Sequence, residues 1–409
     1  MQQNNLVTGR DIVIVGQQAW DVEIGSNNKN LAVKYSQHNR VLYVNPALDR
    51  ITLIRKKKDP KIQKRLNIIR GREDGLVTLQ DNLWNLYPDT IVESITWIKS
   101  KFLFGIFNKI NNRRFARSIS KAIKKLGFTN IILFNDNDIF RSFYLKELLK
   151  PDISIYYMRD FVQAVDYWKY HAVYLEPKLI AKSDLCLGNS TYYTGYCKKI
   201  NPYSYYVGQG CDLEMFSNLE DKTPPAEFSS IPKPIIGYVG AIQSIRLDID
   251  LIAYIAETRP DWSIVLVGPE DEVFKECKLH GINNIYFLGS KPMEQLPSYI
   301  NAFDVCFNPQ VVNQVTIGNY PRKVDEYLAM GKPVVGTKTD AMSIFAEQAY
   351  LATTKEDYIT FIEDALQNND PSLPEKRRKL ALSHTWDKNT ADVYFGINNY
   401  LLHRKNKRK

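Results

Sequence analysis

Short apolar runs alternate with helical stretches along most of the chain, and this alternation limits the possible folds more than any other feature. Residues 11–16 and 40–45 are rich in β-branched side chains, and each run ends in a glycine or an asparagine. Continuously apolar runs of this kind are typical of parallel strands buried on both faces. The same pattern predicts strands at 130–134, 153–157, 185–188 and 203–207. We therefore expect a Rossmann-like α/β domain over residues 1–216.

The alternation of apolar runs with helical stretches is interrupted once and then resumes. Residues 217–234 lack periodicity and are rich in Pro, Ser, Thr and Glu, which indicates a linker. After it we predict strands at 235–240, 263–268, 285–289, 305–308 and 333–337, and helices at 248–258, 294–301 and 321–330. This predicts a second Rossmann-like domain over 235–385, followed by a C-terminal segment, 386–409, with a helix at about 387–403. A chain of 409 residues favours two such domains facing each other across a cleft.

Composition narrows the class of protein. The hydrophobic content of 44% and the aromatic content of 12% exclude a disordered chain. The five cysteines are scattered and form no Cys-x-x-Cys pair, so neither a zinc site nor a disulfide framework is predicted, and a reducing cytoplasm fits best. We find no signal peptide and no apolar run of about 18 residues, the length needed to span a bilayer. We expect a cytoplasmic protein whose membrane contact, if any, is peripheral and at the inner face of the membrane.

The net charge of +9 is concentrated in part of the first domain. Residues 94–130 hold nine Lys and Arg and no acidic residue, and apolar side chains recur there at i, i+3, i+4 spacing. This pattern predicts basic amphipathic helices, which can lie on an anionic membrane. The other interpretation is a solvated face whose apolar side packs on the domain core. A second basic run at 55–65 favours the membrane interpretation.

The segment 316–335 is the most informative for function. Pro321 suits a first helical turn, Gly331 suits the position after the last turn, and Pro333 prevents continuation. In the predicted helix, Asn319, Arg322 and Glu326 share a face at i, i+3 and i+7, with Lys323 beside them.

Cations at a helix N-terminus predict a phosphate site, because the free backbone N–H groups there also attract anions. Glu326 follows about 5–6 Å along the helix, where its carboxylate can accept hydrogen bonds from both ribose hydroxyls. The predicted ligand is therefore a nucleoside diphosphate.

Residues 321–335 read Pro-x-Lys-x-x-Glu-Tyr-Leu-Ala-x-Gly-Lys-Pro-Val-Val. This run resembles the donor-site signature of the retaining GT-B glycosyltransferases of family 4, especially bacterial surface-polysaccharide members. The likeness extends to the strand ends at Gly240, Gly268 and Gly289 and to residues 209–212. It implies a GT-B fold whose C-terminal helix returns to the first domain, and a UDP or GDP sugar as donor.

The resemblance also implies roles for single residues. Glu326 would hold the ribose, the Gly240 loop would approach the diphosphate, and the loop of Gly289, Ser290 and Lys291 would face the base. This chain departs from the family at two positions. Gly318 replaces a Glu that often contacts the donor sugar, and Ala241 replaces the usual Arg after the first glycine.

Arg246 is then the nearest basic candidate for the diphosphate. We expect Arg246 and Lys323, with Arg322 in reserve, to stabilise the leaving group as catalytic cations without a metal ion or cofactor.

In the first domain the family places a His or a carboxylate after the strand that corresponds to 154–160. Asp160 stands nearest and is the candidate to accept the acceptor proton or to stabilise the transition state; the alternative is a surface ion pair with Arg159 or with a Lys. His171 is a weaker candidate. Four residues are assigned to the acceptor side: Gln17, Gln18, Asp136 and Asp138. For the last two, acceptor contact or loop capping is favoured over metal binding.

The sequence therefore predicts a retaining transferase that moves a sugar from a nucleotide sugar to a lipid-linked or oligosaccharide acceptor in surface-glycan synthesis. A nucleotide-sugar epimerase of the same fold is the first alternative, although such an enzyme would be expected to place several His in the cleft and the chain has only five in all. A non-enzymatic nucleic-acid-binding protein is the second, and we expect no nucleic acid among the partners.

Overall fold

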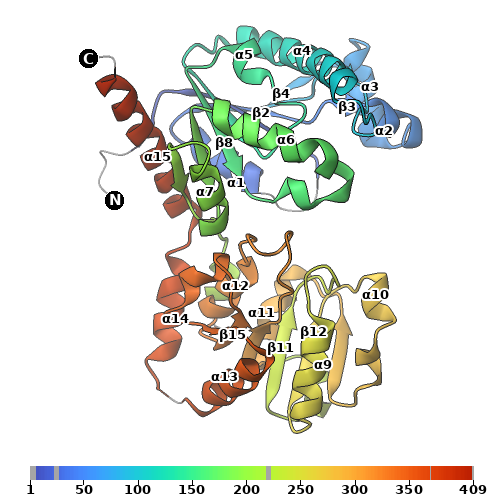
Figure 1. Ribbon diagram of the computed structural model, residues 1–409, viewed down its shortest axis with the longest axis vertical. Coiled ribbons are helices and arrows are strands. Elements are labelled where there is room, and N and C mark those ends of the chain that lie inside the picture. The colour runs from blue at the N-terminus through green and yellow to red at the C-terminus, as the bar shows by residue number, and fades with distance from the viewer. Residues whose placement is uncertain (1–5, 23–26, 218–222, 369, 408–409) are drawn as a thin grey trace. The chain divides into compact units, whose positions relative to one another are not determined.

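The computed structural model describes residues 6–22, 27–217, 223–368 and 370–407. The chain divides into two compact units, residues 1–208 with 389–409 and residues 209–388 (Figure 1). Residues 209–216, which the sequence assigned to the first domain, thus group with the second unit. Part of the predicted linker, 218–222, lies outside the described residues, and Ala226–Ser230 of it form a 3-10 helix that buries Phe228.

The first unit contains an eight-stranded sheet in the order β10-β9-β8-β7-β1-β2-β5-β4. The strands are β1 (Asp11–Gly16), β2 (Arg40–Val44), β4 (Leu76–Gln80), β5 (Leu83–Leu86), β7 (Ile131–Asp136), β8 (Ile153–Met158), β9 (Leu185–Gly188) and β10 (Ser204–Tyr206). All pairs are parallel except β4 with β5. Asp11 is in register with Arg40 on one side and Ile131 on the other, so β1 is central.

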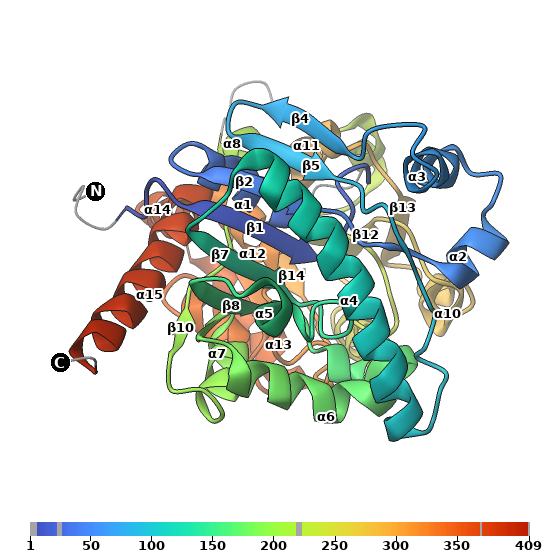
Figure 2. The same ribbon diagram turned by 90° about the horizontal axis from the view of Figure 1, so that it is seen from above.

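Helices surround this sheet (Figure 2). They are α1 (Asn27–Ser36), α2 (Arg50–Arg55), α3 (Pro60–Ile69), α4 (Lys101–Leu126), α5 (Leu145–Leu149), α6 (Asp166–Lys182) and α7 (Thr191–Lys198), and a short parallel pair joins β3 (Leu48–Asp49) to β6 (Ile91–Val92). The last helix, α15 (Trp386–Asn406), packs on the first unit: Asn39 Nδ2 donates to Tyr394 Oη at 3.1 Å. The predicted return of the C-terminal helix is confirmed.

Residues 101–126 of the basic stretch 94–130 form one long helix, α4, whose packing on the core agrees with the second interpretation, whereas membrane contact stays a prediction. One stripe of α4 packs on the core, since Phe104 and Phe115 are each only 1% exposed. Phe102 and Phe107 in the first two turns are exposed instead. None of the helices in the described ranges is long and apolar enough to span a bilayer.

The second unit contains a six-stranded parallel sheet in the order β13-β12-β11-β14-β15-β16. The strands are β11 (Ile235–Val239), β12 (Ser263–Val267), β13 (Ile285–Gly289), β14 (Val305–Asn308), β15 (Val334–Thr337) and β16 (Tyr350–Ala352). In chain order this is the 3-2-1-4-5-6 arrangement of the Rossmann fold, with the switch point between β11 and β14. Ligands of such sheets bind at the carboxyl ends of the strands beside that point.

The helices of this unit are α8 (Glu214–Ser217), α9 (Ile249–Thr258), α10 (Glu272–Lys275), α11 (Leu296–Ala302), α12 (Arg322–Ala329), α13 (Lys355–Gln367) and α14 (Leu373–Leu382). Asp248 caps α9 by accepting from Leu251 N at 2.9 Å, and Asp250 pairs with Lys278 at 2.6 Å. Both carboxylates therefore have structural partners.

Candidate functional site

The helix predicted to bind phosphate is α12, which begins at Arg322. Pro321 stands at its N-cap, and Gly331, with φ +75°, follows its last turn. Asn319 precedes the helix, and its N–H donates to Thr316 O at 3.0 Å. The prediction that Asn319 shares a helical face with Arg322 and Glu326 is therefore wrong. The cause is Pro321, whose backbone (φ −88°, ψ +78°) is not helical.

The Lys323 amine lies against the turn that follows β11. It hydrogen-bonds to Tyr238 Oη, and its nitrogen is 4.1 Å from the centre of the Tyr238 ring. A Cβ placed on Gly240 would lie 3.0 Å from the same nitrogen. Lys323 and Gly240, which the sequence assigned to one diphosphate site, are therefore neighbours in the structure.

The Gly240 turn is close-packed against the next strand end. Gly240 and Gly268 have φ of +141° and +152°, values that side chains rarely permit. A Cβ on Gly268 would lie 1.9 Å from the Gly240 carbonyl oxygen, so only glycine fits there. The two turns thus hold bare backbone beside the Lys323 amine, which suits close approach of an anion.

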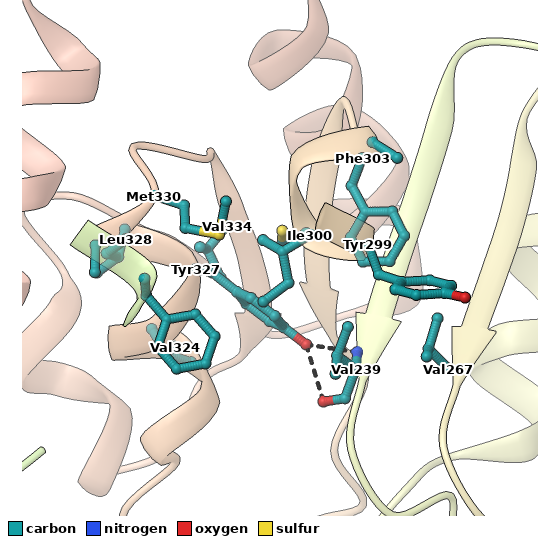
Figure 3. Close-up of a cluster of buried hydrophobic side chains, with 14 of the residues drawn as sticks. Val239, Val267, Tyr299, Ile300, Phe303, Val324, Tyr327, Leu328, Met330 and Val334 are labelled. Atoms are coloured by element: carbon teal, nitrogen blue, oxygen red, sulfur yellow. Dashed lines mark hydrogen bonds between the residues drawn. The ribbon is translucent and has the colours of Figure 1, made fainter. Parts of the chain in front are cut away.

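Tyr327 fixes α12 to the end of β11 (Figure 3). Its buried hydroxyl accepts from Val239 N at 2.8 Å and donates to Val239 O at 3.2 Å. Val324 and Leu328, on the apolar side of the helix, pack in the same core. Because Val239 directly precedes Gly240, this clamp sets the separation between Lys323 and the glycine turn before any ligand binds.

Glu326 lies one turn along α12 and is partly buried. Its side chain is 14% exposed, and Oε1 is 3.4 Å from Arg322 Nη2. Burial raises the pKa of Glu326, and the nearby Arg322 and Lys323 offset this only in part. The cations at the helix tip and the carboxylate one turn later are thus arranged as the sequence predicted.

Other predicted donor-side residues are placed differently. Lys291 pairs with Glu227 Oε1 at 2.6 Å and lies over the Tyr299 ring, so it is held by the 3-10 helix instead of being free to face a base. Ser290 is exposed beside Gly289. Arg246 is also exposed, and within the described ranges no side-chain hydrogen bond or ion pair joins it to α12. Its backbone carbonyl accepts from Val311 N at 2.9 Å, which ties its loop to the segment after β14.

A buried cluster next to Glu326 was missed by the sequence analysis. Asp325 is fully buried, and its carboxylate receives Tyr320 Oη and His384 Nδ1, each at 2.7 Å. Cys211 Sγ approaches the same carboxylate at 3.2 Å. These contacts tie three separate segments of the second unit to α12. One signal in the sequence could have indicated this cluster. Asp325 stands next to Val324 and three residues before Leu328, so its carboxylate lies on the apolar side of the helix.

In the first unit, Asp136 at the end of β7 is fully buried and pairs with Arg159 through both oxygens. The prediction that Asp136 contacts the acceptor is therefore wrong, because Arg159 occupies its carboxylate. Burial opposes the charge of Arg159, but Asp136 and Asp160 outweigh it and raise the guanidinium pKa. Asp136 thus holds Arg159, whose side chain is 19% exposed, in a fixed position.

Asn137, in the left-handed conformation at φ +56°, brings two other predicted residues together. Its carbonyl accepts from Gln17 Nε2 at 2.8 Å, and its Nδ2 donates to Asp160 O at 3.2 Å. The Asp160 side chain is 61% exposed and lies 3.9 Å from Arg159 Nη1. Asp160 is thus accessible beside a fixed cation, and its catalytic role stays a prediction.

Three remaining predicted residues have structural contacts. Asp138 accepts from the N–H groups of Phe140 and Arg141, each at 3.1 Å, so the loop-capping alternative applies to it. Gln18 O accepts from Tyr43 Oη at 2.7 Å. His171 is buried, stacks on Phe104 at 3.6 Å between ring centres and contacts Ile98 O at 2.7 Å, which argues against a catalytic role.

A cavity of about 430 Å³ opens in the first unit beside Gln17 and Asp138. Its lining mixes carboxylates, amides, cations and aromatic rings, among them Asp49, Arg55, Glu93, Asn108, Arg141 and Trp168. Thr96, also in the lining, has a buried hydroxyl for which the described residues provide no hydrogen-bond partner. Arg50 and Arg114 hold Glu93 in place at 2.6 and 3.1 Å. No cluster of His, Cys, Asp and Glu in the described part of the chain could hold a metal ion.

Comparison with known proteins finds a family that resembles part of the second unit. Residues 233–368 match the family described as "Glycosyl transferases group 1". The chain is 29% identical over 191 residues to the Bacillus subtilis (strain 168) protein named "Putative teichuronic acid biosynthesis glycosyltransferase TuaH". That match covers 44% of this chain and 47% of the relative, so it spans about half of each.

Solved structures match almost the whole chain in fold. Sucrose-phosphate synthase from Thermosynechococcus elongatus has a TM-score of 0.63 at 14% identity, covering 97% of this chain and 100% of its own. Anabaena HepE in complex with UDP and glucose has a TM-score of 0.59 at 12% identity, covering 95% and 99%. Residues 233–368 are therefore similar to glycosyl transferases group 1, and the chain has the α/β fold of the GT-B glycosyltransferases.

Proposed function

We propose that the protein is a glycosyltransferase that transfers a sugar from a UDP or GDP sugar, with retention, to a lipid-linked or oligosaccharide acceptor in surface-glycan synthesis. The proposal includes peripheral contact with the inner face of an anionic membrane through residues 94–130. The relative named for teichuronic acid biosynthesis and the HepE complex with UDP and glucose support the glycan product and the nucleotide-sugar donor.

One observation carries the donor assignment: the Lys323 amine lies at the Gly240 turn, and the Glu326 carboxylate follows one helical turn later. The Lys323 ammonium and the N-terminus of α12 would stabilise the diphosphate that departs when the glycosyl bond breaks. Glu326 would accept hydrogen bonds from the ribose hydroxyls. Arg246, on its exposed loop, would contribute a second cation to the phosphates, and no metal ion is required for this charge stabilisation.

In the first unit, Asp160 would act on the acceptor. Its exposed carboxylate lies beside Arg159, which Asp136 holds in place. Gln17 and the polar cavity next to it would bind the acceptor glycan, since amides, carboxylates and aromatic rings together suit a saccharide.

The epimerase and nucleic-acid alternatives are less well supported. His171, a candidate base in the first unit, is buried and already hydrogen-bonded. A nucleic-acid-binding protein would gain nothing from a carboxylate beside its phosphate-binding cations. An epimerase would convert the nucleotide sugar to its epimer without any acceptor. A transferase would release the free nucleotide only as the glycosylated acceptor forms.

The test is a thermal-shift panel with UDP, GDP, CMP and their sugar conjugates, because a ligand that binds only the folded state raises the melting temperature. We expect stabilisation by UDP or GDP and its sugars, not by CMP, and a smaller shift for Glu326→Gln. Transfer should persist in EDTA, and NMR of the first product should show the donor's anomeric configuration. Equal shifts for the wild type and Glu326→Gln would contradict the donor assignment.

A further inference from the structure

The first unit exposes a cluster of large apolar side chains. In α4 and the segment before it, Trp97 is 69% exposed and Phe102 76% exposed, and Ile106 and Phe107 follow one turn later. In α6, Tyr167 is 64% and Tyr170 43% exposed. We call these six residues the apolar face. Burying them in the core would normally be favourable, so their exposure in one region needs a partner.

The two helices that carry the apolar face are joined at this end, as Figure 2 shows. Tyr170 Oη donates to Lys99 O at 2.7 Å, and His171 Nε2 contacts Ile98 O at the same distance. Phe104 stacks on His171 beneath them. The face is therefore one surface on a packed support, not two separate patches.

Cations surround this surface. Lys99 and Lys101 lie over the rings of Tyr170 and Tyr174, at 4.8 and 5.0 Å. Beyond the apolar turns, the outer side of α4 continues with Lys109 and Arg113, and the exposed residues 55–58 are Arg-Lys-Lys-Lys. Apolar and aromatic side chains within a ring of Lys and Arg complement an anionic lipid surface, where the rings enter the interface and the cations meet the headgroups.

The cavity of the first unit opens beside the apolar face. Tyr167 belongs both to the face and to the cavity lining, which also includes Arg55 and Lys56 of the basic run. Because the cavity adjoins the apolar face, an amphipathic lipid could place its polar head in the cavity while its apolar tail remains in the lipid layer.

We propose that the apolar face inserts into an anionic lipid surface, and that the cavity beside it takes the polar head of a lipid-borne acceptor. The acceptor part rests on the proposed transferase function and selects the lipid-linked acceptor over a free oligosaccharide. The binding surface itself extends the predicted stretch 94–130 to α6 and to the basic run 55–58.

The test is co-sedimentation of the full chain with vesicles of phosphatidylcholine alone or of equal parts phosphatidylcholine and phosphatidylglycerol. We expect binding to the mixed vesicles, weakening in high salt, and little binding to phosphatidylcholine. The double variant Phe102→Ser with Ile106→Ser should bind the mixed vesicles at least about tenfold more weakly, because two interfacial anchors are lost. The matched control is Phe395→Ser with Leu402→Ser, an exposed pair on α15, which should bind like the wild type.

Two further measurements separate this proposal from the donor assignment. The double variant should keep the wild-type thermal shift with UDP or GDP, so loss of vesicle binding with intact nucleotide binding supports the surface alone. In a transfer assay, the variant should lose activity toward vesicle-borne acceptor lipids extracted from a glycan-producing membrane. Three results would overturn the proposal. The variant could bind vesicles as the wild type does, the wild type could fail to bind anionic vesicles, or light scattering could show a dimer that buries the apolar face.

Discussion

Replacing Lys323 by methionine tests the donor site most directly. The change keeps most of the side chain's length and removes its charge. The amine lies at the Gly240 turn, so a bound phosphate oxygen would come within about 4 Å of it, where two unit charges attract by about 4 kcal/mol at an effective dielectric constant of about 20. Desolvation consumes part of this attraction, and a net value of about 2–3 kcal/mol is usual for a charged hydrogen bond. We expect UDP, or GDP if the base is guanine, to bind about 30- to 150-fold more weakly.

The assay is isothermal titration calorimetry with the nucleoside diphosphate and, separately, with the nucleoside alone. Uridine or guanosine carries no phosphate, so its affinity should stay within about twofold of the wild-type value if Lys323 acts on phosphate. Lys355→Met is the matched control, because Lys355 also lies over a tyrosine ring, 4.3 Å from the centre of Tyr254. A loss below about threefold for the diphosphate, or equal losses for diphosphate and nucleoside, would refute the reasoning.

Three further predictions concern other parts of the molecule. Glu326→Gln should weaken nucleoside and diphosphate alike, by about 1–2 kcal/mol. Because burial raises the pKa of Glu326, wild-type affinity for the nucleoside should increase as the pH rises above 4.5 through that raised pKa, and nucleoside titrations of the variant should be flat. Gly268→Ala should destabilise the second unit by about 2–4 kcal/mol in urea unfolding, because its Cβ would meet the Gly240 oxygen, whereas Gly281→Ala, with open space around it, should change little. Arg50, followed by Arg114, lowers the pKa of Glu93 to about 2 from 4.5. Glu93→Gln should therefore cost about 1–2 kcal/mol of unfolding free energy above pH 4.5, after allowance for solvent screening, and the stability difference between variant and wild type should vanish as the pH falls toward 2. A stability difference that persists at pH 2 would contradict this cause.

The sequence predicted most of the fold because buried parallel strands have a strong local signature. Runs such as 12–15 and 264–267 are apolar throughout, and the structure buries every residue in them. Among the missed strands, β4, β5 and β16 lie at or next to sheet edges, where partly exposed residues break that signature. Periodicity gives no information on such strands, since their pairing depends on a neighbour that is already in place.

The candidate site was predicted less evenly. Lys323, Gly240 and Glu326 could be placed because one helix and one strand end fix all three. Asp136 and Lys291 could not, since their ion pairs with Arg159 and Glu227 join residues 23 and 64 positions apart. A side chain's partner across such a distance is set by tertiary packing, which no local pattern records. The same reason hid the contacts of Asp325 with His384 and Cys211.

The return of α15 has a consequence for synthesis of the chain. Val393, Tyr394 and Ile397 are buried, and the Tyr394 ring lies 5.7 Å from that of Tyr35. The second unit is contiguous in sequence and can fold as it leaves the ribosome, but the first lacks part of its core until translation passes residue 397. The unit made first is thus completed last. A nascent chain stalled at residue 388 should therefore recruit chaperones through its N-terminal half.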